Sequence, residues 1–336
     1  PVDSAASPVR YRVEPDSVLR MGTAAVFASS SASGWIRVSS DRSDLAARLQ
    51  TGDFASSLEE VSPAIPLTDQ IVLLPAGNPL AARVLRIVNP TGNFTAVNVS
   101  VFDRQGNVAA TIPAALDSHE GIDINLASVP TGSSVRISSS QAVVAQVEVR
   151  AVDSLLLLNG QAGTGLTASF RVAPHAVIGN GFESTLLLSN PTGQTITVFA
   201  TLFSQSGGSV HVSQSQPPRH SLTIPANGSV SADVSQLTEL LFVPAVNGWI
   251  EIESPNVALA GGLVVSQGRN RTIYPLQLVS ESEIFYPLSG AVDSQLSGLI
   301  VTNLSGVSAD VEIAAIDEDG FTLARSSIVV AARSKA

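Results

Sequence analysis

The residues that could do chemistry in this chain of 336 residues are few and scattered. The best metal candidate is the run Asp317-Glu318-Asp319-Gly320, because clustered carboxylates in a turn can bind calcium. The run occupies a hairpin-turn position of the repeat described below, so a turn without metal is the favoured interpretation. The histidines do not have the spacing of metal ligands: His119, His175, His211 and His220. We therefore expect no metal and no cofactor.

Catalytic signatures are also missing from the sequence. It contains no Gly-x-Ser-x-Gly elbow, no Gly-x-x-x-x-Gly-Lys phosphate loop and no His-Glu-x-x-His pair. The glycine-rich stretch 160–165 is followed by no helix and no acidic partner, which favours a linker. Trp35 and Trp249 could stack on sugars, but both occupy the same position of a repeat, which favours a core or interface role. We expect that the protein is not an enzyme.

Composition excludes several classes of protein. The chain has no cysteine, so a disulfide-stabilised miniprotein and a zinc ribbon are excluded. The excess of 28 acidic over 18 basic residues removes the electrostatic drive for binding nucleic acid. The longest apolar stretch, 257–265, is far shorter than the roughly 20 residues of a membrane-spanning helix. The start at Pro1, the single methionine and the Ser/Thr-rich composition favour a mature chain that is extracellular or on the cell surface.

A repeat with three copies organises the elements that would position these residues. The segments 83–92, 184–193 and 297–306 align without gaps, and they place Asn89, Asn190 and Asn303 at one position. A turn glycine follows each asparagine after 17 residues. Between the two turns every second residue is apolar, as in Val311, Ile313 and Ala315 of the last copy. This alternation predicts half-buried strands.

A second half of the repeat is marked by a glycine and a strand. The three examples begin at Gly34, Gly132 and Gly248, which lie 98 and 116 residues apart, and two of them read Gly-Trp-Ile. The two halves together contain about seven short strands per hundred residues, a count typical of β-sandwiches. The sequence therefore predicts an all-β fold of tandem β-sandwich repeats.

The repeat is out of phase with the chain. We predict a second-half fragment at 1–62, whole repeats at 63–168 and 169–282, and a first-half fragment at 283–336. Each fragment would leave an apolar face uncovered, so we expect completion by another copy of the chain, head to tail. Closure of one chain on itself and excision from a longer array are the alternatives. The expected interface residues are Tyr11, Val13, Trp35, Ile36, Val38, Val311, Ile313, Ala315, Ile328 and Val330.

The Asn-Pro-Thr-Gly turns, the Gly-Trp-Ile strands and the strand count resemble those of tandem immunoglobulin-like β-sandwich repeats of bacterial surfaces and extracellular filaments. The resemblance covers nearly the whole chain, although the Cys-Trp-Cys pattern of antibody domains is absent. It implies a structural subunit of an extracellular filament or surface appendage, with copies of itself as partners. The alternative that it implies is a surface adhesin or carbohydrate-binding module, with surface glycans as partners.

Overall fold

The computed structural model describes residues 48–53, 58–63, 67–73, 81–151, 154–162, 167–210, 219–237, 245–268, 270–277, 299–316 and 321–336. In this part of the chain nearly all regular structure is antiparallel β-sheet, which confirms the predicted all-β class. The only helix among these residues, α2 (Val234–Leu237), is a single turn, and none is long and apolar enough to cross a membrane.

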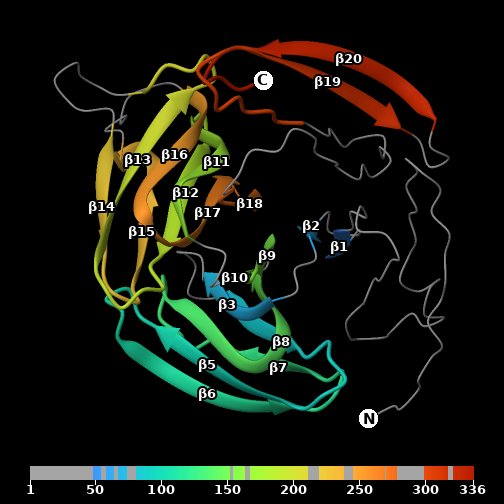
Figure 1. Cartoon of the computed structure of the whole chain (residues 1–336), viewed down its shortest axis with the longest axis vertical. Helices are drawn as coiled ribbons and strands as arrows, with labels where there is room; N and C mark the ends of the chain where they lie inside the picture. The colour runs from blue at the N-terminus through green and yellow to red at the C-terminus, as the bar shows by residue number, and fades with distance from the viewer. Residues whose placement is uncertain are drawn as a thin grey trace.

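The strands fall into four groups along the chain. The first group is a hairpin of β1 (Arg48–Asp53) and β2 (Leu58–Pro63). The first unit, residues 67–162, contains β3 (Leu67–Leu73), β4 (Ala82–Val88), β5 (Thr95–Phe102), β6 (Val108–Leu116), β7 (Gly121–Asn125), β8 (Ser134–Ala151), β9 (Ser154–Asn159) and β10 (Gln161–Ala162). The second unit, residues 167–277, contains β11 (Thr167–Gly179), β12 (Phe182–Ser189), β13 (Ile196–Ser204), β14 (His220–Ile224), β15 (Ser229–Asp233), β16 (Ala245–Ala258), β17 (Ala260–Gln267) and β18 (Asn270–Pro275). The terminal segment, residues 299–316 and 321–336, contains β19 (Ala309–Ile316) and β20 (Thr322–Val330). Figure 1 shows the two units and the β19–β20 hairpin following one another along an arc.

The first unit is built around the long strand β8. The beginning of β8 pairs with β3 and β5, and β6 pairs with the far side of β5. The end of β8 pairs with β4 and β9, and β7 pairs with the far side of β4. Apolar residues from both groups of strands, among them Leu85, Val99 and Ile137, are fully buried in one core. Their alternation with polar residues is the pattern that directs one side of each strand inward.

The second unit repeats the main pairings of the first. β16 pairs with β11 and β13, while β17 pairs with β12 and β18, so these two strands together take the place of β8. The pairing corrects one expected correspondence between the units. Ser134 lies opposite Phe102 where Trp249 lies opposite Phe203, so Ser133, not Gly132, corresponds to Gly248. The predicted match of Gly132 with Gly248 was therefore wrong by one residue. It aligned two identical residue types, whereas the strand register is set by which residues pair across the sheet.

The repeated asparagine closes a turn from inside. In the second unit the Nδ2 of Asn190 donates to the carbonyls of Gln194 (2.7 Å) and Pro225 (2.8 Å), and its Oδ1 accepts from the amide of Thr192 (2.9 Å). Asn89 and Asn303 make the same bonds in the first unit and in the terminal segment. Buried backbone carbonyls need such partners, which explains why this residue type recurs.

Candidate functional site

Outside the cores, the described residues form well-defined contacts between consecutive units. We call the contact between the first and second units the first joint, and the contact between the second unit and the terminal segment the second joint. In each joint, one end of a unit contacts the turn of the next unit that contains the repeated asparagine. We call this turn, together with the neighbouring turn that it bonds to, the tip of that next unit. The tips comprise residues 89–92 and 117–121, 190–193 and 225–229, and 303–306 and 331–335.

An arginine fills the centre of the first joint. Arg136 on β8 lies over the ring of Phe102, with its guanidinium carbon 5.0 Å from the ring centroid. Its Nη2 donates to the carbonyl of Pro191 (2.6 Å) and to Oδ1 of Asn227 (3.1 Å), both on the tip of the second unit. A planar guanidinium can stack on an aromatic ring and donate hydrogen bonds from its edge at the same time. Arg136 therefore connects the two units directly.

Backbone contacts complete the first joint. The amide of Ser229 donates to the carbonyl of Arg104 (3.2 Å), and the Ser229 hydroxyl donates to the carbonyl of Gly132. Gly106 adopts φ of 86° and lies directly against the carbonyl of Ala226. A side chain at Gly106 would meet that carbonyl, so the close approach of the two units requires glycine here.

The second joint also has a central arginine, but it comes from the other partner. Arg333 on the terminal tip lies over Phe203, 4.7 Å from the ring centroid, and over Trp249 at 5.5 Å. Its guanidinium pairs with the carboxylate of Glu251 (3.2 Å) and reaches the carbonyl of Leu304 (3.5 Å). By strand register Glu251 corresponds to Arg136, and by tip geometry Arg333 corresponds to Asn227. The positive charge has changed sides while the place of the guanidinium is kept.

Trp249 forms a small apolar cluster at the second joint. Its ring stacks on Phe203 with a centroid separation of 4.4 Å and an interplanar angle of 13°, and its Nε1 donates to the carbonyl of Arg333 (3.0 Å). Val172 and Leu304 pack against the pair, and Trp249 is 0% exposed. Because it is fully covered, Trp249 cannot offer a platform to a sugar, and the predicted core or interface role is confirmed for this residue.

A buried lysine closes the second joint. The amide of Lys335 donates to the carbonyl of Gln205 (2.9 Å), the counterpart of the Ser229 to Arg104 bond. Its Nζ contacts the carbonyl of Gly248 (2.9 Å), Nδ1 of His175 (2.9 Å) and Oδ1 of Asn247. Burial lowers the pKa of Lys335 to about 8. Burial and the nearby Lys335 charge lower the pKa of His175 to about 4, so its ring is neutral and can accept at neutral pH.

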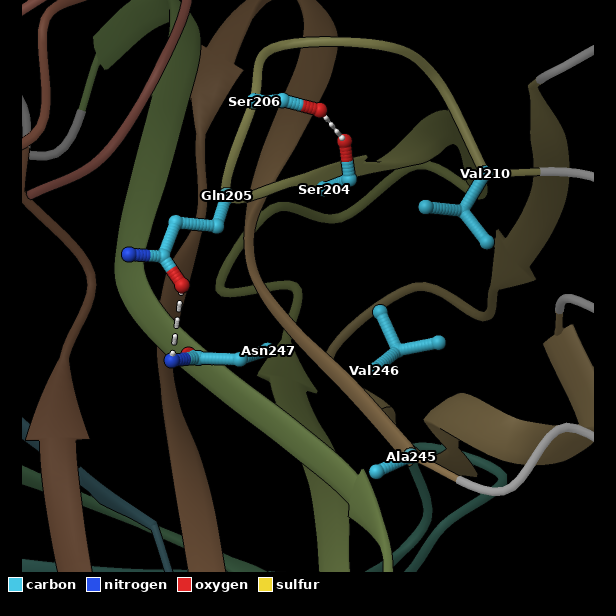
Figure 2. Close-up of a pocket in the computed structure, with 7 residues that line it drawn as sticks. All are labelled: Ser204, Gln205, Ser206, Val210, Ala245, Val246 and Asn247. Atoms are coloured by element: carbon cyan, nitrogen blue, oxygen red, sulfur yellow. Dashed lines mark hydrogen bonds between the residues drawn. The ribbon is translucent and has the colours of Figure 1, made fainter.

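No catalytic constellation accompanies these contacts in the described residues. A hollow of about 490 Å³ lies next to Gln205 and Asn247. Figure 2 shows the residues that line it: Ser204, Gln205, Ser206, Val210, Ala245, Val246 and Asn247. Val210 and Val246 face each other across it, and none of the seven side chains titrates near neutral pH. The same part of the chain holds no group of three or more residues that could bind a metal ion. The carboxylate run 317–320 and His211 lie outside the described residues.

The predicted interface residues divide into two groups. Tyr11, Val13, Trp35, Ile36 and Val38 lie outside the described residues. The other five lie on β19 and β20, where Val311 is paired with Ile328, and Ile313 and Ala315 follow Val311 at every second position. These four side chains share one face and are partly exposed, whereas Val330 is buried. The sequence did not reveal Arg136, Arg333 or Lys335, since a joint between units has no local pattern.

Comparison with known proteins adds little to this description. No family model matches the chain, and no curated protein matches it significantly. One similar solved chain is described as the structure of a beta-glucuronidase from glycoside hydrolase family 2, with 9% sequence identity and a TM-score of 0.14. The match covers 62% of this chain and 23% of that chain. A similarity at this level carries no argument about fold or function.

Proposed function

We propose that the protein is a non-enzymatic structural subunit of an extracellular filament or surface appendage. In this proposal its units are immunoglobulin-like β-sandwich repeats, and each joint holds two consecutive repeats in a fixed orientation. The recurrence of one joint geometry supports the proposal, because a spacer needs stiff connections more than it needs a ligand site. The arginine stacking and the close backbone approach at Gly106 and Gly207 are features of a packed contact rather than of a free linker.

The exposed face of the β19–β20 hairpin is the observation that carries the proposal. Val311, Ile313 and Ala315 are partly exposed, while the residues at the same positions of β5 and β13 are 0–3% exposed. Eight large hydrophobic side chains are exposed among the described residues, and five of them belong to the terminal segment: Leu299, Val307, Phe321, Leu323 and Val329. Not all five lie on this face, because Val329 is paired with Asp310 and points away from Val311. Such a concentration of apolar surface is typical of a protein interface.

The two units indicate what would cover this face. In them the edge of β5 or β13 that faces away from β6 or β14 is paired with the beginning of β8 or β16. The Gly-Trp-Ile run near the start of β16 recurs at Gly34-Trp35-Ile36. We propose that residues 34–40 of a neighbouring copy add to the edge of β19, with Ile36 opposite Ala315 and Val38 opposite Ile313. Strand addition of this kind propagates head to tail, because donor and acceptor lie on different surfaces.

Substitution on the two faces of β19 tests this proposal. Ile313→Glu places a charge on the face to be covered, and Ala314→Glu places the same charge one residue along, on the opposite exposed face. Sedimentation velocity and electron microscopy of the full chain should show polymers for the unsubstituted protein and Ala314→Glu, and single molecules for Ile313→Glu. Far-UV circular dichroism checks that the units stay folded. If the unsubstituted chain forms only single compact molecules at high concentration, the proposal is wrong. The edge of β19 would then be covered either by the same chain or by further repeats of a longer chain.

The adhesin alternative has lost one of its two candidate platforms, because Trp249 is covered by the terminal tip. The run Asn303-Leu304-Ser305 has the Asn-x-Ser pattern of an N-glycan acceptor, but the side chain of this asparagine is already occupied. Asn303 is 8% exposed and its Nδ2 donates to three carbonyls, so a glycan cannot be attached there without breaking the turn.

A further inference from the structure

The first unit has a tip of the same construction as the two tips that dock. His119 has φ of 61°, and the corresponding Asn227 and Arg333 both have φ of 56°. The amide of Glu120 donates to the carbonyl of Asp117 just as the amide of Gly228 donates to that of Pro225. An identical backbone places identical donors and acceptors on the surface. The tip of the first unit therefore has the same backbone shape as the two tips that are bound by a preceding unit.

This tip differs from the other two in its exposure. Gly121 pairs with Val88 as Ser229 pairs with Ser189, so Gly121 is the counterpart of Ser229 and, through the tip geometry, of Lys335. Ser229 is 7% exposed and Lys335 is 5% exposed because a preceding unit covers them. Gly121 and its neighbour Glu120 are exposed. The first unit thus presents an uncovered docking surface in the described part of the chain.

The position of the β1–β2 hairpin indicates what belongs there. Its six residue pairs, from Arg48 opposite Pro63 to Asp53 opposite Leu58, repeat the six-pair register of β8 with β9 and of β17 with β18. In addition, β2 lies against β9 of the first unit as β9 lies against β18 of the second. The β1–β2 hairpin therefore lies against the first unit in the same way as the hairpin formed by the end of β8 and by β9 lies against the second unit.

The chain length before β1 agrees with this correspondence. Gly34 precedes Arg48 by the same 14 residues that separate Gly248 from Gly262, and Arg48 and Gly262 hold the same register position. Residues 33–38 would then reach the tip of the first unit as residues 247–252 reach the terminal tip. Arg37 falls at the position of Arg136 and Glu251, and Trp35 falls at that of Trp249.

We propose that residues 33–38 dock on the tip of the first unit of the same chain and form a third joint. Arg37 takes the central guanidinium place and donates to the carbonyl of Pro90, the counterpart of Pro191 and Leu304. The exposed carboxylates of Asp117 and Glu120 on this tip complement the charge of Arg37. The contacts of residues 33–38 with this tip lie within one chain, so they can form at dilutions where no filament assembles. The half-repeat that supplies Phe203 and Gly207 to the second joint has its counterpart at the third joint only when a neighbouring copy is bound.

Engineered disulfides test the third joint, and the absence of native cysteine makes the result unambiguous. Ser33→Cys with Gly121→Cys joins the two positions that correspond to Asn247 and Lys335. Asn247→Cys with Lys335→Cys, at the known contact, is the positive control. Ser33→Cys with Gly193→Cys, on the tip that already carries the first unit, is the negative control. Non-reducing electrophoresis and peptide mapping at low protein concentration should show an intramolecular bond in the first two pairs and none in the third.

A bond in the positive control alone would overturn the proposal, and so would a Ser33–Gly121 bond found only between molecules. A second measurement avoids dependence on cross-linking. In a Trp249→Phe background Trp35 is the single tryptophan, and docking should shield it from acrylamide. Gly121→Arg should block the tip and raise the quenching, whereas Asp123→Arg on the same strand should not. Equal quenching in both variants would also overturn the proposal.

Discussion

Replacing Trp249 with alanine should release the terminal segment while the second unit remains folded. Trp249 packs with Val172, Phe203 and Leu304 in a cluster that is separate from the main core of the unit. Truncation of a buried tryptophan typically costs about 3–5 kcal/mol, which includes the stacking on Phe203 and the cavity that is left. Val172 and Phe203 belong to the second unit itself, so the share that falls on the second joint comes from the contact with Leu304 and the bond to the Arg333 carbonyl. Loss of that buried hydrogen bond alone, about 1–3 kcal/mol, should weaken the docking equilibrium by roughly fivefold to a hundredfold, and the full cost of about 3–5 kcal/mol sets an upper limit of a few thousandfold.

Hydrogen exchange measured residue by residue can detect this change. The amides of Asn303 and Lys335, which donate to Ser334 and Gln205, report on the terminal segment. Amides of β12 and β17 report on the core of the second unit. Trp249→Phe is the matched control, because it keeps an aromatic ring on Phe203 and removes only the bond to the Arg333 carbonyl and part of the volume. We expect a loss of about 1–3 kcal/mol for that variant, the cost of leaving one buried acceptor unpaired.

Two results would refute this reasoning. Unchanged protection of the Asn303 and Lys335 amides in Trp249→Ala would mean that the ring does not hold the terminal segment. An equal loss of protection in β12 and β17 would mean that Trp249 belongs energetically to the core of the second unit, and that the joint is a by-product of its packing.

Two further predictions concern the same joint. The docking of the terminal segment should strengthen with rising pH, because the pKa of Lys335 is about 8 when buried and 10.5 when released, so the released state binds the proton more tightly. Urea titrations followed by hydrogen exchange should show the gain between about pH 8 and 10.5, and a similar slope in Lys335→Met would contradict it. Gly207→Ala should weaken the joint by about 1–2 kcal/mol, because φ is 89° and an added Cβ would lie 2.7 Å from the carbonyl of Ala332. Gly193→Ala, with nothing within 4 Å of the new carbon, should be neutral, and equal small-angle scattering changes in both variants would contradict the prediction.

The strand-level prediction succeeded where the signal was local. Alternation after each asparagine marks β5, β13 and β19, because a pleated strand with one buried side needs an apolar residue at every second position. The asparagine itself was interpreted as a turn residue. The structure adds its physical role, since its side chain satisfies the carbonyls of a strand end 27 to 35 residues away in sequence. The predicted boundaries at 62, 168 and 282 remain predictions.

The wrong match of Gly132 with Gly248 shows the limit of alignment without structure. Two glycines can align in sequence although the hydrogen-bond register makes a serine, Ser133, the structural counterpart of Gly248. Pairing decides the correspondence, because each ladder position fixes which face a side chain occupies.

The amino-acid sequence by itself determined the local structure of this protein: which segments are strands, where they turn, and which side of each strand is apolar. Only the tertiary structure decided how the units meet. Arg136 contacts a carbonyl 55 residues away and Trp249 one 84 residues away, and these contacts depend on the placement of whole units rather than on neighbouring residues. The guanidinium comes from the receiving end in one joint and from the tip in the other, because the space over the aromatic ring lies between the two surfaces and a long side chain can reach it from either one.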